Sequence, residues 1–184
     1  MRKFRRPRPG SRPPVRPQPC PGGFCPTPPR PPVPPSRPHP PPHPPVPPTL
    51  PIDHGRQPFV LDISRATLGN NNFRTALWTG RHLQLTLMTI PPGGDIGLEI
   101  HPDTDQFLRL EQGQGIVQMG RDRRNLNFRQ TVMQDFAVFV PAGMWHNITN
   151  IGHTPLKLYS IYAPPQHPPG TVHATKAIAD MMGD

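Results

Sequence analysis

Apolar and polar side chains alternate along the chain from Phe59 onward, in short runs separated by glycine-, proline- and asparagine-rich turns. Side chains of a β-strand point to opposite faces in turn, so this alternation predicts strands that bury one face. Turn signals recur every eight to twelve residues, which is typical of β-sandwiches and barrels. The expected strands are 59–63, 73–78, 83–90, 96–101, 106–111, 115–119, 126–132, 136–140, 145–150 and 156–162.

The sequence predicts two regions of different character. We expect residues 1–57 to form a proline- and arginine-rich tail, and residues 58–184 to form one domain without an internal repeat. The folded unit should begin near residue 57 and be stable alone. Helix-forming residues from Thr175 to Met182 predict one short helix at the end of the domain.

The first 50 residues hold 22 of the 33 prolines, and all of the net charge of +9 comes from residues 1–57. Proline lacks a backbone donor and fixes φ, so such a segment favours extended, disordered polyproline II chain over a packed core. We interpret it as a spacer or tether. A docking role is the alternative, because Pro32–Arg37 matches a PxxPxR ligand pattern and Arg2–Arg8 could meet an anionic surface. Because residues 58–184 are electrically neutral, specific nucleic-acid binding is not expected.

Both cysteines, Cys20 and Cys25, lie in the tail. With His39 and His43 they approach zinc-finger spacing, but a finger needs its histidines on a helix and three prolines separate these two. A local disulfide, an intermolecular crosslink and two unused thiols all remain open. No segment has the length and apolarity of a signal peptide or membrane span, so we expect a cytoplasmic protein, or alternatively attachment to a surface or coat layer through the tail.

Four polar side chains are expected to meet inside the domain. Glu99 and His101 fall on one face of the predicted strand 96–101. On the next strand Arg109 and Glu111 are expected to face outward, so Gln106 faces inward. His146 follows a Pro-x-Gly turn that can redirect the chain. A buried carboxylate needs a compensating partner, so the alternative to a metal is an ion pair between Glu99 and Arg109. Asp105 is the rival to Gln106 as a ligand.

These residues resemble the two motifs of the cupin superfamily. Pro141, Gly143, His146 and Asn150 match the spacing of the second motif, with Asp135 at the place of its leading glycine. In the first motif His101 matches the second histidine and Gly113 the closing glycine, while Glu99 replaces the first histidine and Gln106 the glutamate. The segments 99–107 and 158–165 are similar to small bacterial single-domain cupins that are often labelled mannose-6-phosphate isomerase-like.

The resemblance implies an all-β cupin double-stranded β-helix, a jelly-roll barrel, that pairs as a homodimer. It also implies a divalent transition metal bound by Glu99, His101, Gln106 and His146. Two histidines and one carboxylate suit non-haem iron, although manganese, zinc and nickel are equally compatible with the sequence. We therefore expect a small-molecule enzyme of oxygenase or sugar isomerase-like type. The alternative is a ligand-binding or structural cupin whose tail mediates attachment.

Arg109, Trp145 and Tyr162 are the side chains we expect nearest to a small-molecule ligand. The remaining domain histidines, at positions 82, 153, 167 and 173, are predicted to be exposed because they lie near turns or the chain end. The sequence contains no nucleophilic triad, phosphate-binding glycine loop or dinucleotide fingerprint.

Overall fold

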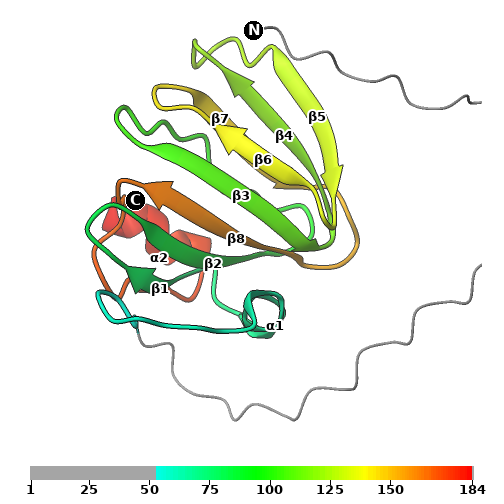
Figure 1. Ribbon diagram of the computed structural model, residues 1–184. Coiled ribbons are helices and arrows are strands. Elements are labelled where there is room, and N and C mark those ends of the chain that lie inside the picture. The colour runs from blue at the N-terminus through cyan, green and yellow to red at the C-terminus, as the bar shows by residue number, and fades with distance from the viewer. Residues whose placement is uncertain (1–52, 184) are drawn as a thin grey trace, which may run out of the picture. The chain divides into compact units, whose positions relative to one another are not determined.

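The computed structural model describes residues 53–183. In this part of the chain nine strands form two antiparallel sheets, accompanied by two short helices (Figure 1). The larger sheet has the order β6-β3-β8-β2-β1-β9, and the smaller sheet has the order β5-β4-β7. The bounds are α1 Ile63–Gly69, β1 Arg74–Thr79, β2 Gln84–Ile90, β3 Asp105–Gln112, β4 Gln114–Gly120, β5 Phe128–Met133, β6 Ala137–Val140, β7 Trp145–Asn150, β8 Leu156–Ala163, β9 Val172–His173 and α2 Lys176–Met182. The all-β architecture and the short C-terminal helix expected from the sequence are confirmed.

One hydrophobic core lies between the two sheets. Val117 of β4 and Ile148 of β7 face Leu108 of β3 and Leu158 of β8, and each of these side chains is at most 1% exposed. Successive residues on these strands alternate between buried and more exposed, as in β7, where His146, Ile148 and Asn150 are buried. The alternation read from the sequence therefore identifies the inward face of most strands correctly.

The buried face of the larger sheet changes from polar to apolar along the strands. At one end Gln84, Tyr162 and Gln106 lie opposite one another across β2, β8 and β3. Two rows further on, the same three strands present Met88, Leu158 and Leu110. All six side chains are at most 3% exposed, so one end of the barrel has an apolar filling and the other has a buried polar chamber. A polar chamber needs partners for its groups, because unpaired polar atoms are costly to bury.

Two predicted strands are wrong. Residues 59–63 do not form a strand, and Ile63 instead begins α1, whose N-cap Asp62 accepts a hydrogen bond from the Arg65 amide at 3.0 Å. Residues 96–101 form no regular strand either. Gly97 has a positive φ, and the segment meets β7 only through isolated bridges, Asp95 with Thr149 and Glu99 with His146. The loss of regular pairing still leaves Glu99 and His101 beside β7.

Residues 53–57 contact the domain. Asp53 accepts hydrogen bonds from the amide and hydroxyl of Thr79, at 2.9 and 2.6 Å, and from the amide of Gly170 at 2.8 Å. The backbone amide of His54 donates to the carbonyl of Leu77. The expected proline-rich tail up to residue 52, with Cys20, Cys25 and the PxxPxR pattern, lies outside the described residues. Within residues 53–183, no helix is long and apolar enough to cross a bilayer.

Candidate metal centre

Glu99, His101 and His146 bring one ligand atom each to within 4.8 Å of one another. Glu99 Oε1 lies 3.2 Å from His146 Nε2 and 3.4 Å from His101 Nε2. His146 is 1% and His101 6% exposed, whereas the Glu99 side chain is 17% exposed. The cluster is therefore buried, and Glu99 lies at its more accessible side.

The backbone around the turn that precedes β7 positions these side chains. Glu99 and His146 exchange two backbone hydrogen bonds, of 3.1 and 3.0 Å, which hold the irregular segment against β7. Gly143, in the left-handed conformation that favours glycine, donates its amide to the carbonyl of His101 at 2.8 Å. The Pro-x-Gly turn thus ties His101 to the strand that carries His146.

The donor set fits a metal ion. Among the described residues, Glu99 Oε1, His101 Nε2 and His146 Nε2 are buried but form no hydrogen bond of acceptable geometry, despite their short separations. Buried polar atoms are normally hydrogen-bonded, so an inward-facing set without such bonds calls for another partner. His146 Nδ1 lies 3.0 Å from the carbonyl oxygen of Met144. If Nδ1 carries the proton and donates it there, Nε2 keeps its lone pair for a metal, an arrangement common among metal-bound histidines.

Arg74 is the cation nearest to Glu99. Its Nη2 atom lies 3.9 Å from Glu99 Oε2, and the Arg74 side chain is 2% exposed. Burial alone would raise the pKa of Glu99, but the close approach of His101 and His146 and the positive charge of Arg74 together lower this pKa well below its usual range. The Glu99 carboxylate is therefore ionised, as a metal ligand must be.

The alternative partner proposed from the sequence, Arg109, is wrong. Arg109 donates instead to Glu111 at 2.9 Å and to Asp135 at 2.6 Å. Glu111, expected on the outer face, is only 5% exposed, because α1 packs against β3 and Ser64 of α1 donates to Glu111 Oε2 at 2.8 Å. The sequence did not point to Arg74, because a partner so far away in the chain leaves no local pattern.

Gln106 is 3% exposed, and its amide nitrogen donates to Ser160 at 3.0 Å. Its amide oxygen is buried and forms no hydrogen bond within residues 53–183. Gln106 pairs with Tyr162 across β3 and β8, and the Tyr162 ring lies edge-on to His101 at 5.5 Å between centroids. The rival Asp105 is exposed and accepts from the amide of Ala142 at 2.8 Å. Gln106 thus lies on the inner face near the cluster, whereas Asp105 is exposed and binds the backbone of the turn before β7.

The three expected substrate residues are in different places. Tyr162 is fully buried beside His101. Trp145 precedes His146 on β7 and so points to the opposite face, where the Arg123 guanidinium lies 5.4 Å from its ring centroid. Arg109 is held in its ion pairs with Glu111 and Asp135. The structure brings Tyr162 to the cluster, but not Trp145 or Arg109.

Two histidines predicted to be exposed are buried. His167 is 7% exposed, and its ring lies edge-on to Tyr162 at 5.0 Å between centroids. His173 is 6% exposed in β9, opposite Arg74 of β1. The final segment returns to the larger sheet, where β9 pairs with β1 and the His167 backbone amide donates to the side-chain oxygen of Gln84 at 2.9 Å. His82 and His153 are exposed, as expected.

Comparisons with known proteins support the resemblance to cupins. The family model described as a cupin domain matches residues 86–162, which include all four candidate ligands. The uncharacterized protein YrkC of Bacillus subtilis (strain 168) is 65% identical over 127 residues, covering 69% of this chain and 68% of the relative. The uncharacterized protein L612 of Acanthamoeba polyphaga mimivirus is 39% identical over 122 residues, covering 66% and 74%. The crystal structure of BH2720 from Bacillus halodurans is 62% identical and superposes with a TM-score of 0.70, covering 71% of this chain and 98% of that one.

Proposed function

Because this chain belongs to the cupin family, we propose that its barrel binds one divalent transition metal and uses it to act on a small molecule. Glu99, His101 and His146 would hold the metal, with the amide oxygen of Gln106 as a neutral fourth ligand. The observation that carries this proposal is the convergence of one carboxylate oxygen and two imidazole nitrogens, buried and without hydrogen bonds among the described residues.

The surrounding residues prepare each ligand. The Met144 carbonyl fixes the ring orientation of His146, and Ser160 accepts from the Gln106 nitrogen, which leaves the amide oxygen for the metal. Arg74 adds a positive charge 3.9 Å from Glu99 Oε2, which together with the two histidines favours the ionised carboxylate. Edge-on packing of Tyr162 restrains the His101 ring. These contacts preorganise the ligands, which lowers the entropic cost of binding a metal.

A metal bound by two histidines and one carboxylate supplies Lewis acidity and open coordination positions, as in non-haem iron oxygenases. We favour a metal-dependent enzyme of oxygenase or isomerase-like type, in which the apolar half of the barrel provides a rigid support and the polar half contains the reacting groups. A neutral Gln106 ligand leaves the metal more positive than a second carboxylate would. That difference favours binding of an anionic ligand at the open positions.

The test is metal loading followed by assays for turnover. Full-length protein purified without added metal is analysed for iron, manganese, zinc and nickel, then stripped and reloaded with each metal. We expect about one equivalent of metal per chain. Consumption of dioxygen with a panel of small organic acids and sugars would favour the oxygenase, and isomerised sugar would favour the isomerase-like enzyme. Bound metal without turnover would favour a binding protein, and a chain that takes up none of the four metals would contradict the proposal.

A further inference from the structure

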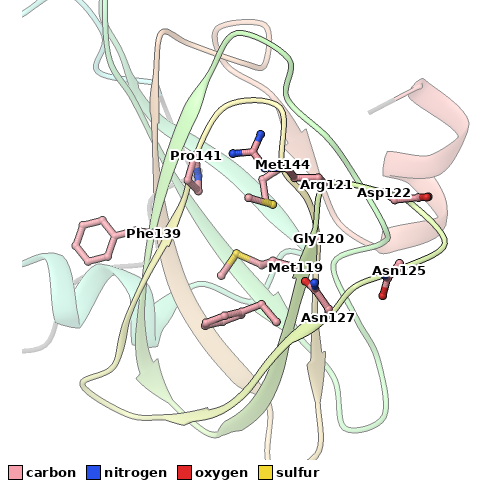
Figure 2. A pocket seen from close by; sticks show the side chains of 10 residues that line it. Met119, Gly120, Arg121, Asp122, Asn125, Asn127, Phe139, Pro141 and Met144 are labelled. Carbon is pink, nitrogen blue, oxygen red and sulfur yellow. The ribbon is translucent and has the colours of Figure 1, made fainter.

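A cavity of about 470 Å³ opens where the two sheets part (Figure 2). β5 is an edge of the smaller sheet and β6 an edge of the larger one, and they do not pair with each other. Phe128 of β5 lines one side of the cavity, and residues 139 and 141, in and just after β6, line the other. Its volume lies within the roughly 300–1,000 Å³ typical of sites for small organic ligands.

The walls of this cavity, which we call the seam pocket, are apolar inside and polar at the rim. Met119 and Met144 contribute its inner surface, and both belong to or pack against the hydrophobic core. Phe128 is 52% exposed, and it lies directly opposite Met119 in the ladder between β4 and β5. The Phe139 ring points away from the other lining side chains and packs edge-on against Phe107, with 5.2 Å between ring centroids (Figure 2). Arg121 and Asn125 come from the connection between β4 and β5. The pocket is therefore built for a ligand with an apolar body and a polar end.

The positive charge of Arg121 indicates that the polar end of the ligand is negatively charged. Figure 2 shows the Arg121 side chain reaching over Met144 toward Pro141. Arg121 is exposed, and within residues 53–183 no carboxylate forms an ion pair with it. The neighbouring Asp122 accepts from the amide of Arg124 at 2.8 Å, so one of its oxygens is already used to shape the loop. The guanidinium is thus available to an anionic group on a ligand in the pocket.

The inner wall of the seam pocket is also the wall of the candidate metal centre. Met119 lies directly opposite His146 in the ladder between β4 and β7, so the two side chains are neighbours on the inner face. The Met144 carbonyl contacts His146 Nδ1 at 3.0 Å. A ligand seated against these two methionines would lie next to the imidazole of His146.

We propose that the seam pocket binds an organic anion, with its apolar body against Met119, Met144 and Phe128 and its acid group at Arg121. This inference deepens the proposed function, because it assigns a ligand class and a binding place to the same site. Only the placement of the ligand beside a bound metal rests on the proposed function. Binding of the anion itself needs no metal and can be tested separately.

The test uses two fluorescent probes with the same apolar body. 1-Anilinonaphthalene-8-sulfonate carries one negative charge, and N-phenyl-1-naphthylamine is its neutral counterpart. Both are titrated into metal-free, full-length protein, and each variant is checked for an unchanged melting temperature. We expect saturable binding of both probes, with the anionic probe binding more tightly.

Arg121→Gln should weaken binding of the anionic probe about two- to fivefold, the range of an exposed charge pair, and leave the neutral probe unchanged. Arg124→Gln is the matched control, because it removes the same charge from the same loop outside the pocket lining and should have no effect. Phe128→Ala should weaken binding of both probes. The proposal would be overturned if Arg121→Gln and Arg124→Gln weakened binding of the anionic probe equally. It would also be overturned if Arg121→Gln left binding of the anionic probe unchanged, or if Phe128→Ala left binding of both probes unchanged.

The probe titrations also separate this inference from the proposed function. If the probes behave as expected but His101→Ala and His146→Ala keep their metal, the pocket stands and the metal centre lies elsewhere. If metal content falls in those variants but probe binding is unchanged in Arg121→Gln and Phe128→Ala, the metal centre stands and the seam pocket is not its ligand site.

Discussion

Glu99 and His146 are joined twice, by a reciprocal pair of backbone hydrogen bonds of 3.1 and 3.0 Å and by a side-chain contact of 3.2 Å. These two backbone hydrogen bonds already set the separation of the carboxylate and the imidazole in the metal-free protein. Glu99 lies in an irregular segment, so these two bonds, rather than a continuous strand, hold it in place. Its charge then depends on Arg74 and the two histidines.

The low pKa of Glu99 predicts acid sensitivity of the metal-free domain. In the unfolded chain Glu99 takes up a proton near its ordinary pKa of 4.5, whereas the folded chain stays deprotonated to much lower pH. The stabilisation is therefore complete above the unfolded value and is lost as the pH falls below it. Glu99→Gln should remove this stabilisation. Below pH 4, the slope of the free energy of unfolding against pH should therefore be smaller in the variant, by up to about 1.4 kcal/mol per pH unit. Denaturant titrations at several pH values measure this slope, and an unchanged slope in the variant would contradict the account.

The buried charge of Arg74 predicts a second effect on stability. Arg74→Met should lower the free energy of unfolding of the metal-free domain by about 3 kcal/mol, because it leaves Glu99 without its nearest cation. Saturating metal should recover part of this loss, since a positive charge again faces the carboxylate. Arg81→Met, at an exposed position, is the matched control. A melting temperature as high for Arg74→Met as for Arg81→Met would show that the ion pair has no such role.

The contacts of Asp53 predict where the chain can be shortened. A chain that starts at residue 51 should melt close to the full-length protein. A chain that starts at Pro58 lacks the hydrogen bonds from Asp53 to Thr79 and Gly170 and should be less stable by about 2–3 kcal/mol. Asp53→Asn in the full-length chain tests the same bonds without truncation. Equal thermal stability of the two shortened chains would show that residues 53–57 contribute little.

Much of the fold could be predicted from periodicity alone. Strand β7 begins and ends where the alternation predicts, and the inward faces of β3 and β8 follow from the same rule. Motif spacing then selected Glu99, His101 and His146, which the structure brings together. Local patterns succeed here because a strand with one buried face must repeat every two residues.

The errors have identifiable physical causes. The segment 59–63 alternates like a strand, but Asp62 can cap a helix, and this N-cap signal before Ile63 was available in the sequence. Glu111 is buried because α1 packs against β3, a contact between elements that single-strand patterns do not reveal. Arg74 and His173 meet through pairing of β1 with β9, a contact between distant parts of the chain. Such partners depend on topology, and local sequence does not encode it.

The neutral fourth ligand provides a graded prediction. Gln106→Ala should weaken metal binding only modestly, because an amide oxygen is a weaker donor than imidazole. Gln106→Glu should strengthen binding of a divalent metal by adding a negative charge at the same position. Isothermal titration with a single metal, such as zinc, compares both with the unaltered protein. A loss in Gln106→Ala as large as that in His146→Ala would show that the amide is a principal ligand instead.

The metal content of the histidine variants tests the central claim most directly. Full-length His101→Ala, His146→Ala and the exposed control His153→Ala are reloaded with one metal, freed of excess, and analysed by inductively coupled plasma mass spectrometry, with folding checked by circular dichroism. The account predicts about one equivalent in the unaltered protein and in His153→Ala, and loss of most of the metal in His101→Ala and His146→Ala. Folded His101→Ala and His146→Ala that both keep a full equivalent would contradict it.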